Sequence, residues 1–105
     1  MLELRLRSGE IVTFDGRILE IFGSTGRCER LHVVQIEAVR VAEAAGHSSV
    51  TFGRDGIGVN FAREETPART RLLAAISEAR RAYARLEPPG EGRAARVIRA
   101  GARRR

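Results

Sequence analysis

The sequence predicts a mainly β domain that is closed by one carboxyl-terminal α-helix. Polarity changes its period at Thr66-Pro67: short alternating segments precede this point, and one stripe at helical spacing follows it. Turns that contain glycine separate the alternating segments. We therefore expect about seven antiparallel strands and then a single helix.

The first three strands are predicted from side-chain parity about two turns. Asp15-Gly16 is a strong signal for a two-residue hairpin turn, because both central residues of a type I′ turn need positive φ. Such a turn places Val12 opposite Leu19, and a three-residue loop at Ser8-Gly9-Glu10 then places Leu6 opposite Val12. The predicted apolar face consists of Leu4, Leu6, Val12, Phe14, Leu19 and Ile21.

Four further strands follow from alternation and from turn residues. They are expected over residues 28–33, 39–43, 49–52 and 57–62, with turns at 23–26 and 45–48. If Asp55-Gly56 forms a two-residue turn, Phe52 lies opposite Val59 and Val50 lies opposite Phe61. All four of these apolar side chains then share one face of the sheet.

The helix is expected from Pro67 to about Leu86. Thr66 is a suitable N-cap, and Pro67 suits the first helical position, where its missing N–H would have no partner. Pro88-Pro89-Gly90 ends the helix. The apolar stripe contains Leu72, Ile76, Ala79, Tyr83 and Leu86. The polar face contains Arg69, Arg71, Glu78, Arg80, Arg81 and Arg85. We expect the stripe to pack on the apolar face of the sheet.

The length of 105 residues fits one domain, which we assign to residues 1–87, with a basic tail over residues 88–105. Residues 1–66 hold eight Arg and ten acidic residues, net −2, whereas residues 67–105 hold eleven and three, net +8. The tail alone carries a net charge of +5, and we expect it to be disordered in free solution. The basic charge therefore belongs to the second part of the chain.

The tail is the candidate anion-binding segment. Its arginines are Arg93, Arg96, Arg99, Arg103, Arg104 and Arg105. Steps of three and four residues would place most of them on one side of a helix if an anionic surface induced one. Nucleic acid and an anionic membrane surface are both suitable partners, through neutralisation of phosphates. The alternative is a solvated tail that has no ligand.

The residue types for catalysis or metal binding do not occur in suitable patterns. Cys28 is the single cysteine, so it cannot form an internal disulfide, and we interpret it as an apolar residue on a strand. His32 and His47 lack a zinc-binding spacing, and Ser48 beside His47 is no evidence of a catalytic triad. We therefore expect no enzymatic activity, no metal and no cofactor. Because no apolar run of about 20 residues occurs, we expect a cytoplasmic protein.

The order of these patterns resembles that of small bacterial pleckstrin homology (PH)-like domains, over about residues 2–86. The resemblance rests on segments 13–19, 32–39, 50–52 and 58–61 and on Ala74-Ala75-Ile76 in the helix. It implies a bent antiparallel sheet, or partly open barrel, of about seven strands capped by the helix. A bacterial origin also fits the composition, because all 19 basic residues are arginine. The first hairpin does not match the basic motif of phosphoinositide-binding PH domains, since Glu10 occupies its loop.

The resemblance implies a non-enzymatic module for protein binding or assembly. We expect a protein partner or self-association through an edge strand or an exposed apolar strip such as Ile18 and Phe22. The alternative function is binding of nucleic acid or anionic lipid through the arginine-rich tail.

Overall fold

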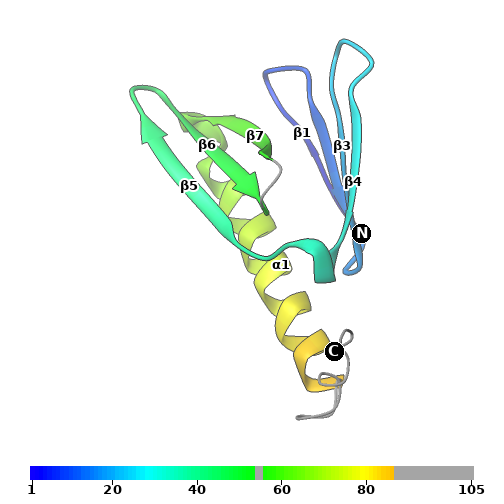
Figure 1. Cartoon of the computed structure of the whole chain (residues 1–105). Coiled ribbons are helices and arrows are strands. Elements are labelled where there is room, and N and C mark those ends of the chain that lie inside the picture. Colours follow the sequence, from blue (N-terminus) through cyan, green and yellow to red (C-terminus); the bar gives the residue numbers. More distant parts are fainter. Residues whose placement is uncertain (54–55, 87–105) are drawn as a thin grey trace.

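The computed structural model describes residues 1–53 and 56–86, and Figure 1 shows their arrangement. The strands are β1 (Leu2–Arg5), β2 (Ile11–Phe14), β3 (Ile18–Phe22), β4 (Cys28–His32), β5 (Val39–Ala44), β6 (His47–Phe52) and β7 (Ile57–Ala62). The helices are the 3₁₀ turns η1 (Val33–Gln35) and η2 (Arg63–Glu65) and the long helix α1 (Thr66–Leu86). The prediction of seven strands followed by one helix is confirmed.

The strands form two antiparallel sheets, of four strands in the order β1-β2-β3-β4 and of three in the order β5-β6-β7. No strand pairing among residues 1–53 and 56–86 joins the two sheets, so the expected single bent sheet is instead two sheets. In Figure 1 the sheets diverge toward the top of the view, and α1 runs diagonally past the three-stranded sheet to the lower end. This open arrangement leaves a strand at each edge of both sheets.

The predicted register of the first two hairpins is wrong by two residues. Phe14 pairs with Leu19, with four residues between them, and Val12 pairs with Ile21. The cause is the Asp15 side chain, whose Oδ1 accepts hydrogen bonds from the N–H groups of Arg17 and Ile18, both at 2.8 Å. These bonds stabilise a longer turn than the type I′ turn expected at Asp15-Gly16. A shift of two residues leaves every side chain on its predicted face.

The other turns differ from the prediction in position or in length. The first loop is Arg7-Ser8-Gly9, because the Leu6 N–H donates to the Glu10 carbonyl at 2.9 Å. In the second sheet Ala44 pairs with His47, so β6 begins at His47 after a two-residue turn. Phe52 pairs with Ile57 and Val50 with Val59, again two residues from the predicted register. Gly53 takes a φ of +81° at the start of this last turn, a conformation that favours glycine.

The core lies between the two sheets and α1. Its fully buried side chains include all six residues of the apolar face predicted for the first hairpins. The second sheet contributes Val50, Phe52, Val59 and Phe61, which share a face as predicted. From α1, Leu72 and Ile76 are buried, while Ala79 and Tyr83 are only partly covered. The helix therefore packs by the first half of its apolar stripe.

The start of α1 differs from the prediction. Thr66 has helical backbone angles, φ −53° and ψ −42°, so it is not an N-cap. Because η2 leads directly into the helix, the Thr66 hydroxyl instead donates to the Arg63 carbonyl at 2.8 Å. The Glu65 carboxylate accepts from the N–H groups of Ala62 at 2.9 Å and Arg7 at 2.8 Å. Glu65 thus ties the start of the helix to a loop of the four-stranded sheet.

Arg27 connects the two sheets at another point. Its Nη1 donates to Glu10 Oε2 and its Nη2 donates to the Gly58 carbonyl, both at 2.7 Å. Its partner Glu10 is 15% exposed, so this ion pair is partly shielded from water. Gly58 is also required locally, because a Cβ at this position would lie 2.6 Å from the Val50 carbonyl oxygen. Arg27 thus ties the loops that precede β2 and β4 to β7.

Three further predictions concern Cys28, the basic tail and the absence of a membrane-spanning segment. Cys28 lies on a strand, but it is exposed and is not an apolar core residue. The tail, with its six arginines, lies outside the described residues. Within the described ranges, no helix combines the length and the apolar character that crossing a membrane requires.

Candidate functional site

The outer edge of β5 presents backbone groups that no other strand pairs with. β5 is the first strand of the three-stranded sheet, and no neighbour on its outer side is found among residues 1–53 and 56–86. The Gly53 N–H donates to the Ala38 carbonyl at 2.8 Å, which directs the backbone of Ala38 toward β6. Because the hydrogen-bonding direction alternates along an antiparallel strand, Val39, Val41 and Glu43 turn their N–H and C=O groups outward.

An apolar groove runs between β5 and α1. Its volume is about 320 Å³, and its lining consists of Val39, Val41, Leu73, Ile76, Ser77 and Arg80. The groove continues the core, because Val41 lies on the same sheet face as its buried neighbour Val50. Val50 is 0% exposed, whereas Val41 is 42% exposed. The helix α1 thus covers β6 but not its neighbour β5, and the inner side of β5 stays exposed.

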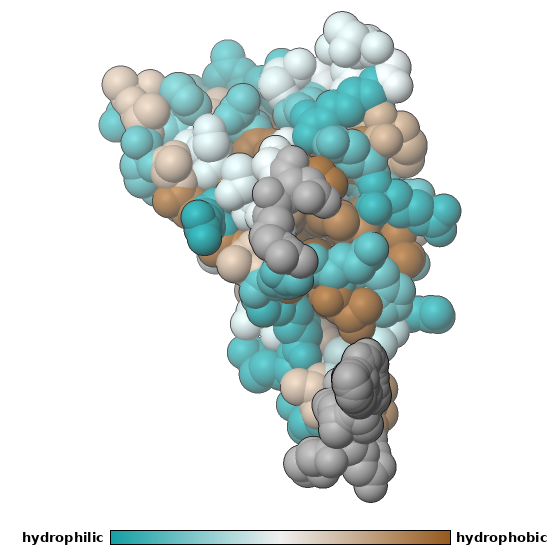
Figure 2. Space-filling model, in the orientation of Figure 1, coloured by the Kyte–Doolittle hydropathy of each residue, from teal (hydrophilic) through white to brown (hydrophobic). Residues whose placement is uncertain are grey.

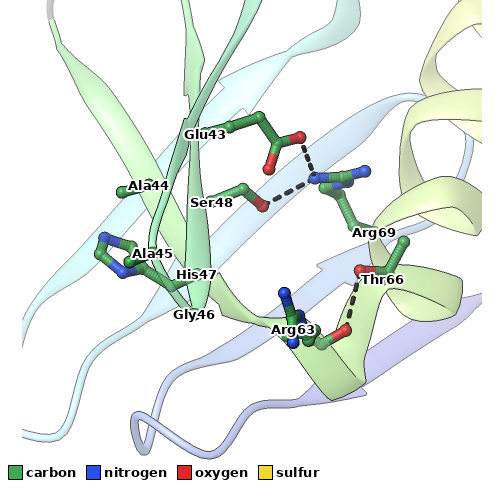
Figure 3. Close-up of a pocket in the computed structure, with 9 residues that line it drawn as sticks. All are labelled: Glu43, Ala44, Ala45, Gly46, His47, Ser48, Arg63, Thr66 and Arg69. Carbon is green, nitrogen blue, oxygen red and sulfur yellow. Dashed lines mark hydrogen bonds and ion pairs between the residues drawn. The ribbon is translucent and has the colours of Figure 1, made fainter.

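Arg69 lies beyond the groove, in a polar pocket at the end of β5. Its Nη1 donates to Ser48 Oγ at 2.8 Å and to Glu43 Oε2 at 3.1 Å, as Figure 3 shows. The arginine side chain is 17% exposed and Ser48 is buried, so Arg69 satisfies a hydroxyl that lies out of reach of water. Glu43 is 70% exposed, so its carboxylate is accessible from solvent, and Arg69 keeps its hydrogen bond to Ser48 if Glu43 turns away.

The polar pocket that adjoins this ion pair has a volume of about 280 Å³. The turn between β5 and β6 and the start of α1 form its walls, and the labelled side chains in Figure 3 include His47 and Arg63. Its polar groups largely bind one another: Arg69 binds Ser48 and Glu43, and Thr66 binds the Arg63 carbonyl. The pocket therefore serves to hold the end of β5 against α1.

Arg80 defines one end of the groove. Its Nη2 donates to the Glu37 carbonyl at 2.9 Å, next to the start of β5. Within the part of the chain that the structure describes, no carboxylate forms an ion pair with Arg80. A second hollow of about 380 Å³ extends from this end along η1 and includes Val34, which is 58% exposed, and Tyr83. The groove thus ends at an arginine whose charge is not neutralised by these residues.

The polar face predicted for the helix is corrected at Arg69. Its side chain is 17% exposed and donates to Ser48 of the second sheet, whereas Arg80 is exposed as expected and donates to the Glu37 carbonyl before β5 begins. The helical spacing alone could not show the burial of Arg69, because this arginine lies beside the apolar stripe and is long enough to reach over it.

The other candidate residues lie apart from the groove. Ile18 and Phe22 lie on the outer side of β3 as predicted, and Phe22 is 36% exposed. His32 Nδ1 accepts from the Val34 N–H at 3.1 Å, and its ring meets Tyr83 edge-on at 5.3 Å between centroids. In residues 1–53 and 56–86, no three of the His, Cys, Asp and Glu side chains gather as metal ligands would. In the view of Figure 2, apolar residues appear as separate patches on a mostly hydrophilic surface.

Comparisons of the chain with protein-family models, with curated proteins and with solved structures found no match. The functional interpretation therefore rests on the geometry of the groove.

Proposed function

We propose that the chain is a PH-like, non-enzymatic module of the cytoplasm that binds a protein segment as an additional strand at β5. The observation that carries this proposal is the outward backbone of Val39, Val41 and Glu43 beside the apolar groove. A strand added at this edge would gain main-chain hydrogen bonds, and its alternate side chains would enter the groove between β5 and α1. Backbone pairing would supply affinity and the groove would supply selectivity.

The PH-like part of the proposal is supported by the order of the elements. Seven strands, divided into four and three, precede one carboxyl-terminal helix, whose Leu72 and Ile76 belong to the core that both sheets share. This order is the one that the sequence pattern predicted together with the resemblance. It supports the PH-like assignment, and the function rests separately on the groove, because one architecture serves many functions.

The non-enzymatic part of the proposal is supported by the burial and the hydrogen bonding of Ser48. Ser48 is the obvious nucleophile beside His47, but its hydroxyl is buried and accepts a hydrogen bond from Arg69. A nucleophilic serine needs an accessible oxygen that a neighbouring base can deprotonate. The guanidinium next to Ser48 offers no such base. We therefore place the function in the groove and not in the polar pocket.

A capture experiment with matched variants tests the proposal. Val41→Lys places a charge in the groove and guards the edge, whereas Phe22→Lys makes the same change on an apolar residue of the other sheet. We expect wild type and Phe22→Lys to retain the same partner from a lysate, and Val41→Lys to lose it. Purified partner should then protect the amide protons of Val39, Val41 and Glu43 from exchange. A partner that binds Val41→Lys as well as wild type, or leaves these amides unprotected, contradicts the proposal.

A further inference from the structure

We propose that the strand bound at this edge is β5 of a second copy of the chain, so that two three-stranded sheets join into one sheet of six strands. This inference rests on the proposed function and names its partner. Pairing would run antiparallel about Val41, with the Glu43 carboxylate of each copy at Arg80 of the other.

The inner side of β5 has the chemistry that the groove requires. Along this side the strand presents Val39, Val41 and then Glu43, two apolar residues followed by an acid. The groove offers apolar contact over Leu73 and Ile76 and ends at Arg80, which has no ion pair within the described residues. A strand of the same composition therefore matches the groove in both polarity and charge.

The direction of the added strand follows from the positions of the two arginines. Arg69, near the start of α1, contacts Glu43 at the end of β5, whereas Arg80, three turns later, contacts Glu37 before β5 begins. β5 and α1 therefore run in opposite directions. A second β5 that pairs antiparallel with the first brings its own Glu43 to the end where Arg80 lies. Both copies gain the same contact because the pair is symmetric.

Two-fold symmetry restricts the register in which the two β5 strands can pair. One residue of β5 must lie directly opposite the same residue of the second copy. A centre at Arg40 would place two arginines directly opposite each other, and a centre at Ala42 would make the two Glu43 side chains diagonal neighbours in the groove. A centre at Val41 places the two valines together and sets each Glu43 opposite Val39, beside Arg80. On the solvent side the two Arg40 side chains then lie diagonally, where water and salt screen their repulsion.

Charge also argues against the carboxyl-terminal tail as the occupant. Residues 88–105 carry a net charge of +5, and the groove ends at Arg80 with Arg81 close by. A segment of the same sign as this end of the groove is repelled. The acidic residue of a second β5 instead neutralises Arg80.

A charge-reversal cycle tests the contact between copies, with the dimer dissociation constant measured by analytical ultracentrifugation of the full chain. Glu43→Arg and Arg80→Glu should each weaken the dimer by about tenfold, and the double variant should return to within about threefold of wild type. Arg71→Glu supplies the control, since Arg71 is an exposed arginine of the same helix that does not line the groove. Glu43→Arg combined with Arg71→Glu should not be rescued. Melting curves confirm that every variant is folded.

Disulfide trapping tests the register. In a Cys28→Ser background, Val41→Cys places two cysteines opposite each other, about 5.5 Å apart between Cα atoms, within the range of a disulfide. Ala42→Cys places them diagonally and farther apart. We expect the covalent dimer from Val41→Cys and little from Ala42→Cys. Preferential trapping of Ala42→Cys overturns the proposed register.

The outcomes separate this inference from the proposed function. A chain that stays monomeric at high micromolar concentration, but binds another protein in a manner that Val41→Lys abolishes, overturns the second copy as partner and leaves the strand-binding function in place. A dimer that Val41→Lys and the charge reversals leave unchanged overturns the β5 interface. Loss of the dimer with Val41→Lys, together with rescue in the double charge reversal, supports it.

Discussion

Replacing Ile76 by aspartate tests whether α1 holds the two sheets together. Ile76 is 1% exposed and belongs to the core between the sheets and the helix. Loss of its side chain should cost about 2–5 kcal/mol, as other substitutions of a buried aliphatic residue by alanine do. A carboxyl group without a hydrogen-bond partner adds about 1–3 kcal/mol, even in its neutral form. The sum approaches the whole free energy of unfolding expected of a small domain, about 5 kcal/mol or somewhat more.

The control places the same residue two positions away. Ala74 is exposed on α1, so Ala74→Asp introduces the same residue into the helix, at a cost in helix propensity of about 0.7 kcal/mol or less, and leaves the core intact. Urea denaturation followed by far-ultraviolet circular dichroism gives the free energies of unfolding. We expect Ile76→Asp to be largely unfolded without urea and Ala74→Asp to resemble wild type. If the two variants differ by less than about 1 kcal/mol, Ile76 does not occupy the core as described.

The remaining predictions concern a turn and the tail. Hydrogen bonds from the N–H groups of Ile18 and Arg17 hold the pKa of Asp15 below its ordinary value, so Asp15 stabilises the fold above about pH 4, and this contribution is lost as the pH falls through the folded-state pKa. The difference in melting temperature between wild type and Asp15→Asn should therefore shrink on acidification. A difference that stays constant between about pH 7 and about pH 2.5 would contradict the pKa shift. If the six tail arginines neutralise phosphates of duplex DNA, log K should fall against log salt with a slope of about −5, and a chain ending at residue 87 should not bind. Competition with anionic vesicles separates nucleic acid from lipid, and no binding to either at about 50 mM salt leaves the solvated tail.

The sequence was sufficient to predict which side of β1, β2, β3, β6 and β7 faces the core. Val12, Phe14 and Leu19 lie on the predicted face although their partners differ from those expected. Parity survives a register error of two residues, because side chains alternate with a period of two. The register itself depends on the length of each turn. Asp15 could form either a tight turn or the longer turn in which its carboxylate binds two backbone N–H groups, and the dipeptide Asp-Gly does not distinguish these.

The groove could not be predicted from the same patterns. Val41 alternates with polar neighbours just as the buried Val50 does, yet the two differ in exposure because α1 covers one strand and not the next. Coverage depends on how the layers are offset, and this offset follows from long-range contacts such as those of Arg27 and Arg69. One signal was present in the sequence: the second half of β5, Ala42-Glu43-Ala44, has no large apolar residue to bury.

The four strand edges of the two sheets differ in a way that points to β5. The inner sides of the other edge strands are covered: Leu4 of β1, Leu31 of β4 and Val59 of β7 are all buried. Ion pairs or hydrogen bonds also lie along those edges, as at Glu3 with Arg5, Glu20 with Arg30 and Gly58 with Arg27. β5 combines outward backbone groups with an uncovered apolar side chain, Val41, and lacks the lysine or proline that commonly protects an edge. An exposed edge of this kind lowers the solubility of a protein. We therefore infer that another strand pairs with β5 and covers it in the working form of the protein.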